Sequence, residues 1–124
     1  MIIDFSISTE DNWSLDNFLL DLPEKWNYSF VEVENEVMLG FIVCSKVNDS
    51  NLHIHRLAVG HNYQNKGIGT ELLNSVLAKA RRHRFIYITL KVGLSNICAQ
   101  KFYEKNNFYL DYLEGANMVY RRII

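Results

Sequence analysis

The sequence predicts an α/β fold with a mixed sheet of six or seven strands and helices on both faces. Two observations carry this prediction. Short apolar or alternating segments that are typical of strands are spread along all 124 residues, and three longer segments repeat their apolar residues at helical spacing. In addition, the order strand, helix, strand across residues 52–92 is the right-handed crossover unit, which makes its two strands parallel.

Seven segments are expected to form strands. They are residues 2–7, 28–34, 37–47, 52–59 and 85–92, with two short strands on either side of the turn at 114–117. Alternation of apolar and polar residues supports the first two, and apolar residues dominate the longer runs. Asn35 tolerates a positive φ, so the turn that it forms with Glu36 predicts an antiparallel hairpin.

Three segments are expected to form helices. Thr9 is suited to cap the first, and Pro23 ends it. The second follows a glycine-bearing turn and ends at the basic run of residues 81–84, which complements the helix dipole. Ser95 is suited to cap the third, residues 96–105, which Asn106-Asn107 can end in the left-handed conformation. The apolar face of the second helix consists of Ile68, Leu72, Leu73, Val76, Leu77 and Ala80.

Length and composition describe a single domain, residues 1–124, that is large enough to bury a core without metal or disulfide support. The net charge of −1 argues against nucleic acid as the main partner, because no excess of Lys and Arg exists to neutralise a phosphate backbone. No apolar run approaches the ~20 residues of a membrane helix, and the acidic amino terminus lacks the basic head of a secretory signal. We therefore expect a cytoplasmic protein without a membrane partner. A homodimer is compatible with the sequence, which contains no pattern that decides the oligomeric state.

Cysteine and histidine residues show no metal-binding pattern. Cys44 and Cys98 lie in apolar strand and helix contexts, so two reduced, buried thiols are expected. His53 and His55 form a pair, but no third ligand follows at a suitable spacing. No metal site is therefore predicted.

A glycine-bearing turn connects the strand at residues 52–59 to the second helix. Its sequence is Gln64-Asn65-Lys66-Gly67-Ile68-Gly69. The first turn of a helix has N–H groups without intrahelical partners and a partial positive charge, so this geometry suits an anion such as a phosphate. The Walker loop and the dinucleotide fingerprint both need glycine spacings that this turn does not have.

This turn resembles the Q/R-x-x-G-x-G/A pyrophosphate loop of the GNAT superfamily of N-acetyltransferases. The resemblance implies a GNAT-like fold and acetyl-CoA as the cosubstrate. It also implies that main-chain amides of the loop hold the pyrophosphate and that main-chain groups at the end of the preceding strand bond pantetheine, with one N–H polarising the thioester carbonyl. The loop residues are Gln64, Asn65, Lys66, Gly67, Ile68, Gly69 and Thr70, and the strand residues are Leu57, Ala58 and Val59.

Two histidines on that strand are candidates for a catalytic base. Residues two apart on a strand share a face, so His53 and His55 are expected to lie on one side together with Leu57 and Val59. A lysine-like ammonium has a pKa near ~10.4, so its deprotonation at pH 7 costs about 4 to 5 kcal/mol, and a base must take the proton. The residues alone also allow a purely structural pair that is hydrogen-bonded against the sheet. The run His53-Ile54-His55-Arg56-Leu57-Ala58-Val59 is similar to the arylalkylamine N-acetyltransferase branch, which implies proton removal through water.

The third helix supplies the other candidate residues. Asn96 and Tyr103 are seven positions apart, which places them roughly on one face. The segment from Asn96 to Lys105 resembles the family's N-x-x-A-x-x-x-Y-x-K helix. The resemblance implies that Asn96 bonds the pantetheine arm and that Tyr103 protonates the departing thiolate. Phe102 and Tyr103 can alternatively both be core aromatics, with the Tyr103 hydroxyl bonded to a carbonyl.

The sequence therefore favours an enzyme that transfers an acetyl group from acetyl-CoA to a primary amine by direct attack. His55, or His53 through water, would take the ammonium proton, and Tyr103 would protonate coenzyme A. The alternative is a non-catalytic acyl-CoA-binding or protein-interaction module that keeps the phosphate loop. The sequence leaves open whether the amine belongs to a small molecule, a peptide terminus or a lysine.

Overall fold

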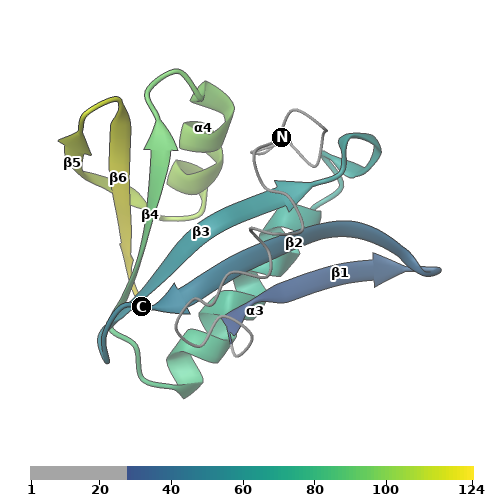
Figure 1. Ribbon diagram of the computed structural model, residues 1–124, viewed down its shortest axis with the longest axis horizontal. Coiled ribbons are helices and arrows are strands. Elements are labelled where there is room, and N and C mark those ends of the chain that lie inside the picture. The colour runs from purple at the N-terminus through teal and green to yellow at the C-terminus, as the bar shows by residue number, and fades with distance from the viewer. Residues whose placement is uncertain (1–27) are drawn as a thin grey trace.

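A computed structural model describes residues 28–124 of the chain, and these residues form one mixed six-stranded sheet with two α-helices (Figure 1). The sheet order is β1-β2-β3-β4-β6-β5. The strands are β1 (Phe30–Glu34), β2 (Val37–Lys46), β3 (Asn51–Val59), β4 (Tyr87–Gly93), β5 (Tyr109–Glu114) and β6 (Asn117–Ile123), and the helices are η1 (His61–Tyr63), α3 (Ile68–Arg82) and α4 (Ile97–Lys105). The predicted α/β mixed sheet is confirmed. The strand expected at residues 2–7 and the helix expected after Thr9 lie outside the described residues.

The central strands β3 and β4 are parallel, as the crossover through α3 requires, and every other neighbouring pair is antiparallel. Within the described residues both α-helices pack on the same face of the sheet. Side chains of α3 and α4 join one core cluster with alternate residues of β4, namely Ile88, Leu90 and Val92. Helices on both faces were predicted, and the helix expected for the second face belongs to the part of the chain that is not described.

The hairpin between β1 and β2 forms where it was predicted. Asn35 has φ 51° and Glu36 has φ 67°. Two consecutive positive φ values give the turn a twist that matches the flanking antiparallel strands. The short turn thus sets the pairing of β1 with β2, which ends with Glu34 opposite Val37.

A β-bulge overturns the expected alternation in β3. Val43 of β2 pairs with Arg56, whereas the next residue, Cys44, pairs with Ile54, so His55 is an extra residue in β3. One inserted residue reverses the faces of everything that follows it. Leu57 and Val59 consequently lie in the core cluster with Leu52 and Ile54. The prediction that they share a face with the two histidines is therefore wrong.

Gly40 lets β2 pack closely against both the end of β3 and α3. A Cβ atom at this position would lie 2.7 Å from the Ala58 main-chain oxygen and 3.3 Å from Leu72 Cδ1. Real Cβ atoms do not approach a backbone oxygen so closely, so only glycine fits here. This contact fixes the end of β3 immediately before the glycine turn.

Helix α4 differs from the prediction at its start. Its cap is Asn96 and not Ser95, because the Asn96 side chain accepts a hydrogen bond from the Ala99 amide at 3.1 Å. At the other end Asn107 has φ 69°, as predicted. The helix is tied to β6 by the buried Tyr120, whose hydroxyl donates to Glu104 Oε2 at 2.8 Å.

The two cysteines have different surroundings. Cys44 is fully buried in β2, and burial raises the pKa of its thiol, so it remains protonated and unreactive. Cys98 is exposed in the first turn of α4, which corrects the expectation that both thiols are buried. Neither α3 nor α4 is long and apolar enough to reach across a lipid bilayer.

Candidate active site

Strands β3 and β4 separate toward their carboxyl ends and leave a cavity between them. They pair only from Asn51 opposite Tyr87 to Ile54 opposite Leu90, although both strands continue beyond these pairs. Figure 1 shows the two strands diverging on either side of α4. The cavity has a volume of about 110 Å³ and is lined from β3 by Ile54, His55, Arg56 and Leu57, from β4 by Leu90, Lys91, Val92 and Gly93, and from α4 and its cap by Asn96, Ala99 and Tyr103.

Four of the predicted site residues meet at this cavity, and one of them is Leu57 near the end of β3. His55 comes from β3, Asn96 caps α4, and Tyr103 lies two helical turns further along. Tyr103 is only 5% exposed and packs edge-on against Phe102 and Phe108. It is therefore both a core aromatic and a cavity residue, so the two roles considered for it do not exclude each other.

His53 does not line this cavity. It lines a second one of about 280 Å³, together with Thr89 and Lys91, whose positions in β4 alternate with those of the core residues. The ring centroids of His53 and His55 are nevertheless 4.9 Å apart in an edge-on arrangement, and Lys91 borders both cavities. The structure thus places His55 at the gap between the strands and His53 on the face away from α4.

Hydroxyl groups from neighbouring strands hold both imidazoles. His53 Nδ1 lies 2.8 Å from Thr89 Oγ1, and His55 Nε2 is hydrogen-bonded to Ser45 Oγ. Burial, with smaller contributions from the charges of His55 and Lys91, lowers the pKa of His53 to about 4, and burial lowers the pKa of His55. Both rings are therefore neutral at pH 7, which is the state that can accept a proton.

The lowered pKa of His53 predicts a pH-dependent contribution to stability. Its pKa is about 4 in the folded protein against 6.5 for an unperturbed histidine, so between these values the unfolded chain binds more protons. The stability contribution is complete above pH 6.5 and is lost as the pH falls toward 4. Compared with wild type, His53→Gln should lose less free energy of unfolding between pH 7 and pH 4, by at most about 3 kcal/mol and by less where solvent screens the ring. Urea unfolding of both proteins at the two pH values measures this difference, and equal losses would contradict it.

A third cavity, of about 280 Å³, lies beside the glycine turn at the start of α3. Within the predicted loop it is bordered by Gln64, Asn65, Gly67, Ile68, Gly69 and Thr70. The first intrahelical hydrogen bond runs from the Glu71 amide to the Gly67 carbonyl. The amides of Ile68, Gly69 and Thr70 come before it, so they have no partner within the helix and are available to an anion.

The backbone of this loop depends on left-handed residues. Gly67 has φ 84° and is the amino-terminal cap of α3, and Asn65 has φ 64°. The Gln64 side chain donates to the Val59 carbonyl at 3.2 Å, which ties the loop back to the end of β3. Lys66 is not among the residues that border this cavity, and it borders a different one of about 420 Å³ together with Glu32 and Glu71.

The end of β3 joins the cavity between the strands to the cavity at the loop. Leu57 borders the former and Val59 the latter. Residues 57–59 pair with β2 on one side, but β3 has no pairs with β4 beyond Ile54. The β4-facing edge therefore carries main-chain N–H and C=O groups that have no partner in the sheet and can bind an extended amide-bearing molecule.

Three residues at the loop cavity were not among the predicted site residues. Tyr63 comes from η1, and Phe102 and Lys105 come from α4. The spacing of Phe102 and Lys105 puts both on one helix face, which is a signal that the sequence contains. What the sequence does not contain is the packing of α4 beside the amino terminus of α3. Within residues 28–124 no group of three or more His, Cys, Asp or Glu side chains is placed to hold a metal ion.

Comparisons with known proteins agree on one family. The model of the acetyltransferase (GNAT) family matches residues 3–108. N-alpha-acetyltransferase 50 of Danio rerio is 31% identical over 112 residues, which cover 87% of this chain and 66% of that protein, so the chain spans just under two thirds of this relative's length.

Two solved structures extend this agreement to three dimensions. Ard1 from Thermoplasma volcanium superposes with a TM-score of 0.82 and 25% identity, over 94% of this chain and 83% of that one. Arabidopsis thaliana Naa50, in complex with the bisubstrate analogue CoA-Ac-MVNAL, gives a TM-score of 0.68 and 27% identity, over 77% and 72% of the two chains.

Proposed function

Because this chain belongs to the acetyltransferase (GNAT) family, we propose that it transfers an acetyl group from acetyl-CoA to a primary amine. The single observation that carries this proposal is the cavity where β3 and β4 separate, because it brings His55 and Tyr103 together from opposite sides. It lies next to the anion-binding start of α3 along the end of β3.

In this proposal acetyl-CoA extends from the loop cavity along the end of β3 to the cavity between the strands. The amides of Ile68, Gly69 and Thr70 bind the pyrophosphate, and the open edge of β3 at residues 57–59 bonds the pantetheine arm. The amide oxygen of Asn96 is already used to cap α4, so its NH₂ group is the part that donates to a pantetheine carbonyl. The thioester then lies in the cavity between the strands.

The chemistry is a direct transfer from sulfur to nitrogen. The neutral amine attacks the thioester carbon, a C–N bond forms, and the C–S bond breaks with its electron pair on sulfur. His55, or His53 through water, takes the proton that the ammonium loses, and Tyr103 donates its hydroxyl proton to the departing thiolate. After attack the nitrogen loses its second proton to solvent, which gives the neutral amide and free coenzyme A. The histidine then releases its proton to solvent, and the Tyr103 phenolate takes one from solvent.

Among primary amines, a peptide α-amino group is the acceptor that we favour. An α-amino group has a pKa of about 7.7 to 8.0, so its deprotonation at pH 7 costs about 1 kcal/mol, against the 4 to 5 kcal/mol of a lysine. This difference matters because both imidazoles have lowered pKa values and are weak bases. The similarity to an N-alpha-acetyltransferase and to a structure with a peptide-containing bisubstrate analogue supports the same class.

Coenzyme A release with a set of matched acceptors tests the proposal. The first acceptor is a peptide with a free α-amine and no lysine. The second is the same peptide with its α-amine blocked and one residue replaced by lysine. The third is a small aliphatic amine. We expect release with the first peptide and little with the other two. Titration calorimetry with acetyl-CoA in the absence of acceptor measures binding separately.

The possible results separate the candidate functions. Binding of acetyl-CoA without release under any acceptor would favour the non-catalytic acyl-CoA-binding or protein-interaction module. Release only with the lysine peptide or the small amine would retain acetyl transfer and reject the α-amine. Absence of binding to either acetylated or free coenzyme A would overturn the proposed function altogether.

A further inference from the structure

Three polar side chains form a hydrogen-bond network between β3 and β4. Asn51 and His53 come from β3, and Thr89 of β4 contacts both of them. Thr89 Oγ1 donates to Asn51 Oδ1 at 3.1 Å, and the same Thr89 oxygen lies 2.8 Å from His53 Nδ1. Thr89 is 8% exposed and is one of two buried polar residues in the described part of the chain. The three residues come from the first pairs of the parallel β3 and β4 ladder, in which His53 stands opposite Thr89.

Counting hydrogens decides the direction of these bonds. A threonine hydroxyl has one proton, and Thr89 donates this proton to the side-chain oxygen of Asn51. The Thr89 oxygen can therefore only accept from His53, so Nδ1 must carry the hydrogen. A neutral imidazole has one N–H, which leaves Nε2 of His53 as the ring's acceptor.

We propose that Thr89 and Asn51 are positioning residues that hold His53 in the Nδ1–H tautomer, with Nε2 as the proton-accepting nitrogen. The role in catalysis rests on the proposed function, in which His53 is one of the two candidate bases, the one that acts through water. His55 is held differently, because its Nε2 is the nitrogen bonded to Ser45. The two imidazoles thus present different nitrogens, although their ring centroids are only 4.9 Å apart.

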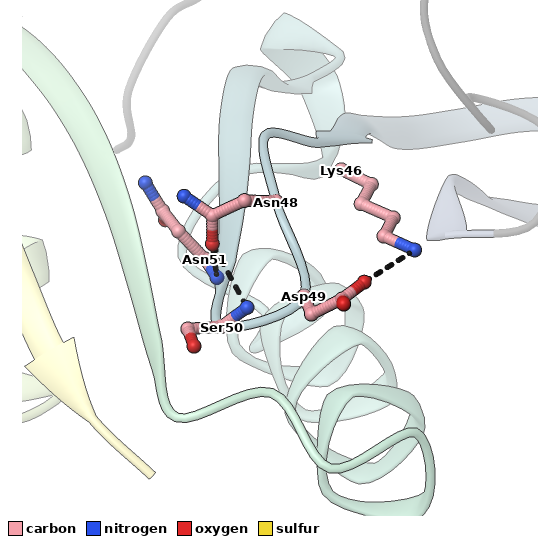
Figure 2. Close-up of polar contacts among 5 residues, drawn as sticks. All are labelled: Lys46, Asn48, Asp49, Ser50 and Asn51. Carbon is pink, nitrogen blue, oxygen red and sulfur yellow. Dashed lines mark hydrogen bonds and ion pairs between the residues drawn. The ribbon is translucent and has the colours of Figure 1, made fainter.

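Asn51, the first residue of this network, is held by hydrogen bonds within the turn between β2 and β3. Asn48 Oδ1 accepts hydrogen bonds from the amides of Ser50 and Asn51 at 2.8 and 2.9 Å, which closes the turn between β2 and β3. Lys46 pairs with Asp49 across the same turn at 3.0 Å (Figure 2). These bonds hold the backbone of Asn51, and its side-chain oxygen contacts Thr89 of β4. The tautomer of His53 is therefore set by Asn51 and Thr89, which do not line the cavity that holds His55 and Tyr103.

The tautomer can be measured without any reaction. Long-range ¹H–¹⁵N correlation spectra of the full chain at neutral pH distinguish a protonated from an unprotonated ring nitrogen for each histidine. In the wild type we expect Nδ1 of His53 to be protonated and Nε2 to be unprotonated. An Nε2–H tautomer for His53 would mean that the Asn51 amide is reversed and would overturn the proposal.

Matched substitutions identify which groups set the tautomer. Thr89→Val keeps the shape and the branched Cβ but removes the hydroxyl, so we expect a loss of the pure Nδ1–H state. Thr89→Ser restores the oxygen and should restore the wild-type spectrum. Ser75→Ala removes a hydroxyl that bonds only within α3 and serves as the control. A wild-type His53 spectrum in Thr89→Val would contradict the role of Thr89.

A second variant tests the proposal independently, in case Thr89→Val does not fold. Asn51→Ala leaves the threonine in place but frees its proton, which can then be donated to His53 Nδ1. We expect the Nε2–H tautomer to appear in this variant while the remaining spectrum stays that of the folded chain. An unchanged His53 ring in Asn51→Ala would show that the amide does not orient the hydroxyl.

The kinetic consequence follows if the enzyme turns over. Thr89→Val should lower kcat by about tenfold, a part of what general base catalysis contributes, while KM for acetyl-CoA stays constant. Thr89→Ser should recover most of the rate. If the wild type shows the expected tautomer but acetylates no amine, the proposed function fails and the assignment of the tautomer stands. If kcat is unchanged in Thr89→Val although its tautomer changes, His53 is not the base.

Discussion

Replacing Tyr103 with phenylalanine should lower kcat for acetyl transfer by about a hundredfold while the Kd of acetyl-CoA stays the same. The variant removes one oxygen atom and keeps the ring, so the packing against Phe102 and Phe108 is preserved. A positioned general acid contributes about 10² to 10⁴ in rate, which sets the lower end of the expected loss. Coenzyme A release at saturating peptide measures kcat, and calorimetry measures the Kd.

Tyr120→Phe is the matched control for this variant. Tyr120 is fully buried like Tyr103, but its hydroxyl donates to Glu104 and it borders none of the three cavities of the site. Its loss leaves Glu104 without this donor and should lower stability by about 1 to 2 kcal/mol, with kcat unchanged. Full activity of Tyr103→Phe would remove this tyrosine from the mechanism.

Replacing Gly67 with alanine should weaken acetyl-CoA binding by about tenfold or more. Gly67 has φ 84°, and a residue with a Cβ is strained there by about 1 to 2 kcal/mol. The empty space around its Cα means that this strain, and not a clash within the protein, drives the change. The cap relaxes toward negative φ, and the amides of the first turn of α3 no longer converge on the phosphates. A tenfold change in Kd corresponds to about 1.4 kcal/mol.

Gly115→Ala provides the matched control for backbone strain. Gly115 also has positive φ, 59°, and open space around its Cα, but it lies in the turn between β5 and β6. Both alanine variants should lose about 1 kcal/mol of stability, whereas only Gly67→Ala should lose affinity. Equal affinities of the two variants for acetyl-CoA would show that the loop does not hold the pyrophosphate.

Local sequence patterns predicted most of the described fold. The alternation in residues 28–34, the apolar face of the second helix and the turn at Asn35 all reappear as β1, α3 and the first hairpin. These features depend on neighbours within a few positions, so the sequence reports them directly. The cap of α4 was misplaced by one residue, because Ser95 and Asn96 are both good caps and only the backbone decides between them.

The order of side chains along β3 could not be predicted. Alternation is a rule for regular strands, and the bulge at His55 breaks it because the pairing with β2 shifts by one residue. The shift depends on how two strands fit together across the sheet and has no pattern in the chain itself. The position of Cys98 is a similar case, since helical periodicity places it on α4 without saying which side of α4 meets the core.

The sequence by itself determined that a strand, a left-handed glycine turn and an amphipathic helix follow one another, because backbone conformation and hydrophobic periodicity are properties of short segments. Only the tertiary structure decided that β3 and β4 part beyond Ile54, that His55 and Tyr103 then border one cavity, and that His53 is turned away toward Thr89. These relations join segments that are distant in the chain, and they arise from strand pairing, twist and packing across the whole sheet.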